Sequence, residues 1–242
     1  MIETAREKFI LQDVESALPL KSWWAMVVVL PVVRHLTLLT VNHTRVTPNA
    51  LTVSAILLRV TTALCFCSTD YRWLVAGAIF YYGAYVLDCM DGAVARLRKM
   101  SSAFGRFLDH IGDLIGDFLI LVALASAQGL LLSPMVAAML FMHLSECYIN
   151  YLAGNLCRGG SPVRSPFLLI NLYNGYRDWW FKRNAKSFFS FPDYTALVFV
   201  VFPLCNRPAE GLKIGFFFLL LISLYTIFST FVSLHTGRNQ FP

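Results

Sequence analysis

Four aspartates are grouped in one short stretch of an otherwise apolar chain. Asp88 and Asp91 are three residues apart, and Asp109 and Asp113 are four residues apart. On helices, both spacings place the two side chains of a pair on one face. Two helices joined by a short turn can therefore direct all four carboxylates into one space. Anions this close in an apolar setting are costly unless a cation lies among them, and oxygen-only ligands favour a hard divalent ion such as Mg²⁺, Mn²⁺ or Ca²⁺.

Small residues and one arginine accompany these carboxylates. Gly92 and Ala95 follow the first pair, and Gly105 precedes the second pair. Small residues allow a helix or a ligand to approach the backbone closely. Arg96 supplies a fixed positive charge suited to phosphate. The combination predicts a pyrophosphate-bearing substrate, whose charge a metal ion would neutralise.

The composition predicts an integral membrane protein that crosses the bilayer several times. Of the 242 residues, 57% are hydrophobic and 14% are charged, whereas a soluble domain carries roughly 25% charged residues. The mean hydropathy is +0.60. The net charge of +6 does not indicate a nucleic-acid partner, because membrane proteins carry excess Lys and Arg on their cytoplasmic loops.

The first part of the chain, 1–46, is expected to form a cytoplasmic, interfacial segment. Residues 4–20 have an amphipathic pattern, and the apolar run 22–33 is shorter than the roughly 20 residues that a span needs. We expect 22–42 to form a helix that lies in the membrane interface. The alternative is a true span that tolerates Arg34.

The remainder, 47–242, is expected to form one domain of six transmembrane helices, so the fold class is all-α. Pro48 favours the start of a helix, where its missing N–H costs nothing. The spans are predicted at 49–68, 72–95, 104–127, 130–154, 192–206 and 211–234.

The distribution of Lys and Arg predicts the orientation. With the amino terminus inside, the outer loops hold only Arg72, Arg207 and Lys213, and nearly all other basic residues lie in cytoplasmic segments. The positive-inside rule therefore places both termini and the aspartate stretch on the cytoplasmic side.

The aspartate stretch resembles the signature of the CDP-alcohol phosphotransferase family. The resemblance extends to the opening of the first span, Thr47-Pro48-Asn49-x-Leu51-Thr52, and to six spans that follow an interfacial helix. The fixed positions that match are Asp88, Asp91, Gly92, Ala95, Arg96, Gly105, Asp109 and Asp113. The resemblance implies transfer of a substituted phosphate from a CDP-linked donor to an alcohol, with release of CMP.

The resemblance also implies roles for individual residues. Asp88, Asp91 and Asp109 would hold one or two divalent cations, Mg²⁺ or Mn²⁺, with two expected. Asp113 would be the general base that takes the proton of the acceptor hydroxyl, and would contact metal as well. The CDP moiety would be bound by Asn49, Gly92, Ala95, Arg96 and Gly105. The resemblance further implies a homodimer.

Isolated charges within the predicted spans are expected to be paired. We predict that Arg59 pairs with Asp117 or with Glu146. Glu146, Arg158 and Arg164 are also candidates for contacts with the acceptor or with a lipid phosphate. The fourth span lacks the arginine pairs of relatives that use phosphorylated acceptors, and this absence weighs against such an acceptor, unless Arg158, Arg164 and Arg177 fold back toward the site.

We therefore expect a phospholipid-synthesising transferase with CDP-diacylglycerol as the favoured donor, an alcohol acceptor and membrane lipids as its surroundings. Two alternatives remain open. An aminoalcohol-type transferase would combine a small CDP-alcohol donor with a lipid alcohol, and an ion-coupled transporter would use the aspartates as an ion relay.

Overall fold

The computed structural model describes residues 8–18, 21–156 and 165–237. These residues are helical, apart from the loops between helices and one isolated β-bridge between Lys21 and Ala185. The expectation of an all-α protein is confirmed for this part of the chain.

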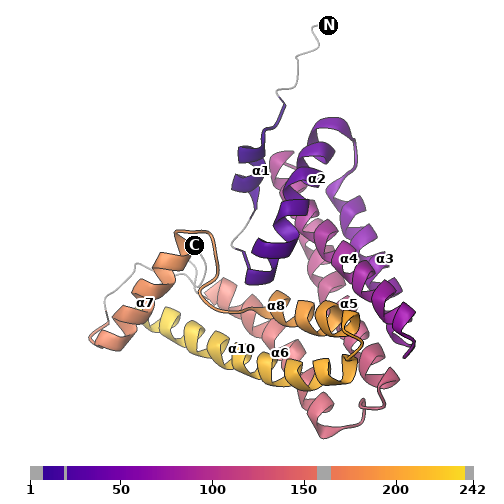
Figure 1. Cartoon of the computed structure of the whole chain (residues 1–242). Coiled ribbons are helices and arrows are strands. Elements are labelled where there is room, and N and C mark those ends of the chain that lie inside the picture. Colours follow the sequence, from indigo (N-terminus) through magenta and orange to yellow (C-terminus); the bar gives the residue numbers. More distant parts are fainter. Residues whose placement is uncertain (1–7, 19–20, 157–164, 238–242) are drawn as a thin grey trace, which may run out of the picture.

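The first helices lie at the amino-terminal end of the molecule (Figure 1). They are α1 (Leu11–Ala17), a π-helical turn η1 (Ala25–Val29) and α2 (Leu30–His43). Arg34, which ends the apolar run of the sequence, lies inside the continuous helix and pairs with Glu15 of α1 at 3.1 Å. The helix predicted at 22–42 is therefore present, and it ends at His43.

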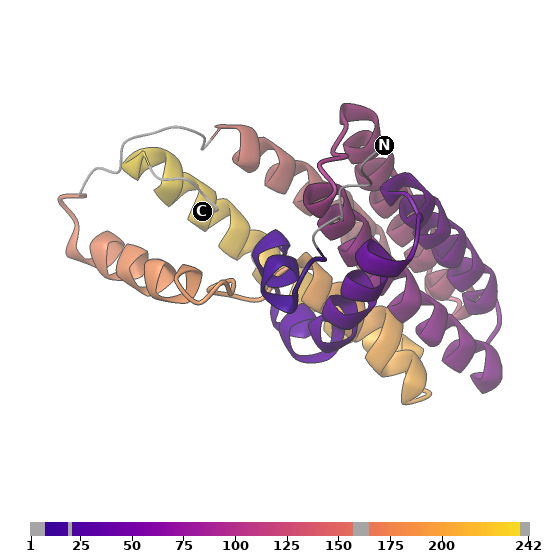
Figure 2. The same cartoon turned by 90° about the horizontal axis from the view of Figure 1, so that it is seen from above.

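Three long helices pack side by side and carry the aspartates, as Figures 1 and 2 show. They are α3 (Pro48–Phe66), α4 (Tyr71–Leu97) and α5 (Ala103–Ala127). The Thr47 side chain caps α3 by accepting from the Ala50 amide, and Ser102 caps α5 by accepting from the Gly105 amide. Both caps satisfy amides that lack a partner within the helix.

The second half of the chain forms a second group of helices, in which α6 and α10 are neighbours and α7 lies at the far end from α3 (Figure 2). They are α6 (Pro134–Leu156), α7 (Leu168–Phe181), α8 (Phe191–Ala196), η2 (Leu197–Val201), α9 (Phe202–Leu204) and α10 (Pro208–Thr236). A buried core that includes Phe66, Tyr81, Leu121 and Phe199 joins the two halves.

Four helices of the described residues are long and apolar enough to cross a membrane. They are Ala25–His43, Pro48–Phe66, Tyr71–Leu97 and Pro208–Thr236. Helices occupy all six predicted span positions, but only three of these positions meet this criterion, and the helix predicted to be interfacial meets it as well.

Arg98, at the carboxyl end of α4, binds the end of α2 and the loop that joins α2 to α3. Its guanidinium donates to the carbonyl oxygens of Val46, Thr40 and Thr44 at 2.6, 2.7 and 2.8 Å. One rigid, five-donor group thereby satisfies several carbonyls at a helix end. The contact fixes the start of α3 beside the end of α4.

Candidate active site

Three of the four aspartates form a compact carboxylate cluster. Asp88 and Asp91 come from α4 and Asp109 from α5, and one potential ligand atom from each residue lies within 4.8 Å of the others. Asp91 is buried and the other two are half-buried. The fourth aspartate, Asp113, lies one turn along α5 from Asp109 and is not part of this group.

Thr52 of α3 orients one member of the cluster. Its hydroxyl donates to Asp91 Oδ2 at 2.5 Å, and both residues are 5% exposed. A buried carboxylate that accepts such a bond is held in one rotamer, which favours a preformed ligand set. Sequence reasoning quoted Thr52 only as part of the pattern that opens the first span.

A cavity of about 300 Å³ adjoins the cluster on the side of Asp91 and Asp109. Both aspartates line it, together with Thr52. The same cavity is lined by all the residues expected to bind the CDP moiety: Asn49, Gly92, Ala95, Arg96 and Gly105. The structure thus brings these residues of α3, α4 and α5 together around one space.

Two glycines allow polar groups to come close in this cavity. A Cβ atom on Gly105 would lie 3.1 Å from Asn49 Oδ1, and one on Gly92 would lie 3.1 Å from a terminal nitrogen of Arg96. Arg96 also donates from Nε to the carbonyl oxygen of Ala17, so α1 helps to hold its guanidinium. A side chain at either glycine would narrow the cavity.

Arg59 of α3 lies on the other side of the cluster and is only 3% exposed. One terminal nitrogen is 2.6 Å from Asp113 Oδ1 and 3.5 Å from Asp88 Oδ1, and Nε is 3.3 Å from Asp117 Oδ1. The predicted pairing with Asp117 is confirmed. The pairs with Asp88 and Asp113 were not predicted, because sequence spacing does not give the depth of α3 relative to α4 and α5.

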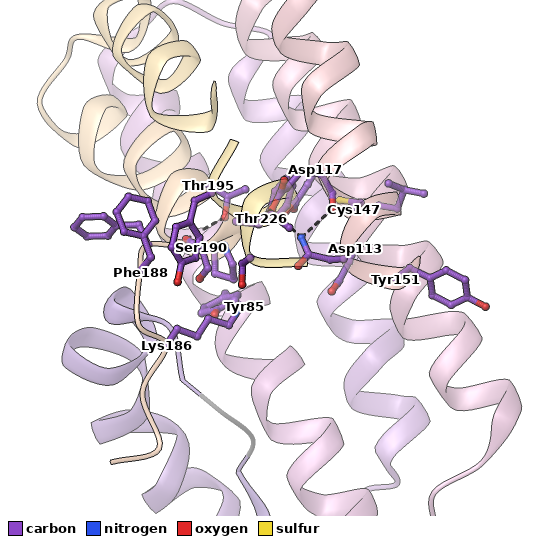
Figure 3. A pocket seen from close by; sticks show the side chains of 18 of the residues that line it. Tyr85, Asp113, Asp117, Cys147, Tyr151, Lys186, Phe188, Ser190, Thr195 and Thr226 are labelled. Atoms are coloured by element: carbon purple, nitrogen blue, oxygen red, sulfur yellow. Dashed lines mark hydrogen bonds between the residues drawn. The ribbon is translucent and has the colours of Figure 1, made fainter. Parts of the chain in front are cut away.

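A second cavity has a volume of about 440 Å³, and none of the three clustered aspartates is among the residues that line it. Asp113, Asp117 and Arg59 line it on one side. Lys186 and Phe188 lie opposite Asp113 and Asp117 in the close view of Figure 3. Asp113 therefore faces a chamber that is distinct from the cavity beside Asp91.

Glu146 of α6 lines this larger cavity and is 1% exposed. Its Oε1 atom accepts from Thr226 at 2.6 Å and from Asn150 at 2.8 Å. Its Oε2 atom is buried without a hydrogen-bond partner among the described residues. Because an unsatisfied buried carboxylate oxygen is costly, this atom is suited to accept a hydrogen bond from a bound ligand. The alternative prediction that Glu146 pairs with Arg59 is wrong.

Two basic residues that follow the fourth predicted span also line the larger cavity. Arg177 of α7 is buried and donates to Ser233 Oγ at 2.8 Å. Lys186 lies in the loop after α7, where desolvation lowers the pKa of its ammonium group against the opposing effects of Asp193 and Glu146. Sequence reasoning missed Lys186. The predicted candidates Arg158 and Arg164 lie outside the described residues.

A family model, CDP-alcohol phosphatidyltransferase, matches residues 45–232. The chain belongs to the CDP-alcohol phosphatidyltransferase family. This membership confirms the resemblance carried by the aspartate pattern, and the matched range contains both cavities.

Two archaetidylinositol phosphate synthases are similar to part of this chain. The chain is 38% identical over 80 residues to an archaetidylinositol phosphate synthase of Pyrococcus horikoshii, and 30% identical over 104 residues to one of Methanothermobacter thermautotrophicus. These matches cover 33% and 41% of this chain, and 41% and 52% of the two relatives, so the chain matches about half of their length.

Solved structures share the fold of this CDP-alcohol phosphatidyltransferase family member. Phosphatidylinositol phosphate synthase of Mycobacterium tuberculosis in its apo form gives a TM-score of 0.53 at 22% identity, covering 85% of this chain and 95% of that one. The same enzyme in complex with manganese and citrate gives 0.52 at 20% identity, covering 85% and 88%.

The carboxylate cluster fits the divalent cation on which the CDP-alcohol phosphatidyltransferase family depends. Its donors are oxygens alone, and they converge from two helices on one point. Such a set suits Mg²⁺ or Mn²⁺ rather than a softer metal. Asp88, Asp91 and Asp109 are the described residues that would hold the ion.

Proposed function

We propose that this protein is a membrane-embedded transferase that moves a substituted phosphate from a CDP-linked donor to an alcohol and releases CMP. One observation carries the proposal. Asp109 faces the cavity lined by the predicted CDP-binding residues, and Asp113, one turn away on α5, faces a separate chamber. The donor in the smaller cavity and the acceptor in the larger one can thus approach the same turn of α5 from two sides.

In this reaction the acceptor oxygen forms a bond to the phosphorus distal to the cytidine. The pyrophosphate P–O bond breaks, and CMP leaves. Asp113 takes the proton of the acceptor hydroxyl, because among the carboxylates that line the acceptor chamber it is the one a single helical turn from Asp109 of the metal cluster. When bound, the divalent cation neutralises pyrophosphate charge and the charge that develops on CMP. Arg96 contributes a fixed positive charge to the nucleotide cavity.

The favoured donor is CDP-diacylglycerol. Exposed apolar side chains on α3 and α5, including Leu57, Leu64 and Leu119, suit lipid surroundings, so acyl chains can lie beside the helices while the cytidine enters the smaller cavity. The structure of the Mycobacterium tuberculosis phosphatidylinositol phosphate synthase has been solved with CDP-DAG bound. Its comparison with this chain gives a TM-score of 0.50 at 21% identity. Similarity at this level supports the common fold.

The acceptor chamber favours a phosphorylated polyol. Lys186 and Arg177 offer positive charge for a phosphate, and the unpartnered Oε2 of Glu146 offers an acceptor for a hydroxyl. The named relatives are synthases of inositol phosphate lipids, which supports the same class of acceptor. Both cations lie beyond the fourth span, and their charge offsets the absence of arginine pairs within that span.

The arrangement in the membrane completes the proposal. Residues 1–46 form the cytoplasmic, interfacial segment, and 47–242 form the transferase domain with six spans. The active site and both termini face the cytoplasm, as the distribution of Lys and Arg supports. The functional unit is a homodimer, as the family resemblance implies.

The direct test is CMP release by the purified protein in lipid nanodiscs with Mg²⁺ or Mn²⁺. CDP-diacylglycerol and CDP-choline serve as donors. Inositol phosphate, glycerol phosphate, inositol and serine serve as acceptors, and diacylglycerol is paired with CDP-choline. We expect release with CDP-diacylglycerol and a phosphorylated polyol, and little release with the unphosphorylated form.

Two controls define the result. Asp113→Asn should lower acceptor-dependent CMP release by at least about 100-fold. Asp178→Asn changes a carboxylate of α7 that is not among the residues lining either cavity, and it should leave the release unchanged. Release with CDP-choline and diacylglycerol alone would favour the aminoalcohol-type reaction. No release with any pair would contradict the proposed function.

A further inference from the structure

We propose that Arg59 serves as the built-in counter-cation of the site, so that the carboxylates hold one divalent ion rather than two. The inference rests on the metal-dependent site of the proposed function. In this arrangement Asp88, Asp91 and Asp109 bind the metal ion, whereas Asp113 and Asp117 pair with Arg59.

The division follows from the distances. Asp88, Asp91 and Asp109 bring ligand atoms within 4.8 Å of one another, so all three can contact one cation. Asp113 is paired with the Arg59 guanidinium at 2.6 Å, and Asp88 also contacts the same nitrogen at 3.5 Å. A second ion bridging Asp88 and Asp113 would have to occupy the position that the guanidinium holds.

Neighbouring residues hold Arg59 in this position. Gly116 of α5 leaves space for its stem, since a Cβ atom there would lie 2.5 Å from Arg59 Cδ. Asp117, which contacts Nε, is itself fixed by a hydrogen bond of 3.0 Å from the Tyr81 hydroxyl. Arg59, Asp117 and Tyr81 are all at least 95% buried. The guanidinium is therefore enclosed rather than placed on a surface from which it could swing away.

The positive charge of Arg59 also favours a single divalent ion. Arginine stays protonated at all physiological pH values, so its positive charge repels a second divalent ion and neutralises carboxylates that would otherwise attract one. A planar guanidinium also reaches several carboxylates at once, which an ammonium group does less well. Asp113 is left paired with a cation while its second oxygen can take a proton.

The test is the number of Mn²⁺ ions bound per chain, measured by equilibrium dialysis and metal analysis on the full-length protein in nanodiscs, with and without CMP. We expect one ion. Two tightly bound ions in the wild-type protein would overturn the inference without affecting the proposed reaction. No bound ion would overturn the metal site itself, and one bound ion without CMP release from any donor would contradict only the proposed function.

Variants of Arg59 provide the second arm. Arg59→Met should bind two Mn²⁺ ions per chain and show a larger rise in thermal midpoint on adding Mn²⁺ than the wild type. Arg59→Lys keeps a positive charge and should still bind one. Arg59→Met combined with Asp117→Asn removes one anion together with the cation and serves if the single variant does not fold. A single bound ion in both Met variants would contradict the proposed role.

Discussion

Thr52 on α3 donates a hydrogen bond of 2.5 Å to Asp91 Oδ2 on α4. This bond links the helix that begins with Pro48-Asn49 to the helix that carries the first aspartate pair. A hydroxyl outside the three-carboxylate cluster thereby sets the rotamer of one of its members. The consequences of this and three other contacts can be measured.

Thr52→Val removes the hydroxyl and keeps the shape of the side chain. We expect Mn²⁺ affinity to fall by roughly 10- to 100-fold, as for other residues that orient metal ligands, because Asp91 loses its fixed rotamer. Equilibrium dialysis measures the change. The matched control is Thr61→Val on the same helix, whose hydroxyl bonds only to the carbonyl of Leu57 and is exposed. Equal affinities in the two variants would contradict the role of Thr52.

Asp113→Asn should impair turnover, whereas Asp91→Asn should impair metal binding. Asp113→Asn removes the proposed base, so kcat should fall by about 10²- to 10⁴-fold while one Mn²⁺ still binds, because the metal cluster does not include Asp113. Asp91→Asn should weaken Mn²⁺ binding itself. The pair is measured by CMP release and by dialysis. Loss of metal in Asp113→Asn would assign that carboxylate to the metal instead.

Lys186 should make the affinity for a phosphorylated acceptor depend on pH. Desolvation lowers the pKa of this lysine, and only its protonated form attracts phosphate. Above roughly pH 7, where a phosphate monoester is already a dianion, KM should therefore rise with pH. It should begin to rise below the ordinary lysine value of about 10.4.

Lys186→Arg tests the assignment, because a guanidinium stays charged over this range. Its KM for the phosphorylated acceptor should stay flat as the pH rises, and the KM for CDP-diacylglycerol should not follow the same curve in either protein. An identical rise in KM in wild type and Lys186→Arg would show that another group is responsible.

Gly116→Ala should destabilise the protein through Arg59. The new methyl group would lie 2.5 Å from Arg59 Cδ, and overpacking of this kind costs about 1–3 kcal/mol. We expect a lower thermal midpoint and weaker Mn²⁺ binding as the guanidinium shifts. Gly175→Ala on α7 is the control, since its Cβ atom would meet nothing within 4 Å. A thermal midpoint of Gly116→Ala equal to that of this control would show that Arg59 can move aside freely.

Much of the nucleotide half of the site could be predicted from the sequence because its residues are local. Asp88 to Asp113 lie on two consecutive helices, and helical spacing alone places each pair on one face. The Pro48-Asn49 opening and the six helical regions follow from apolar length and from helix-start residues. The pairing of Arg59 with Asp117 follows from the cost of an isolated charge.

The acceptor half could not be predicted in the same way, because it joins segments far apart in the chain. Lys186 lies in an irregular loop with no periodic pattern, and Arg177 of α7 is held by a hydrogen bond to Ser233 of α10, 56 residues away. The partners of Glu146 were also missed, since Thr226 lies on α10 and nothing in the sequence gives the register of α10 against α6. The helix before α3 has the bounds expected from the sequence, since the prediction was 22–42 and α2 ends at His43. Its apolar length also satisfies the criterion for a span, which was the alternative to the interfacial position.

The two cavities draw on different parts of the chain. Residues 48–109 line the smaller one, whereas much of the wall of the larger one comes from residues 146–229. Inherited changes in the carboxy-terminal half can therefore alter which alcohol is used while the chemistry of the donor stays intact. Substitutions at Lys186 and Ser229 should accordingly redistribute product among competing acceptors in a mixed assay, with the affinity for the nucleotide unaltered. New lipid headgroups could arise in this way without rebuilding the aspartate cluster.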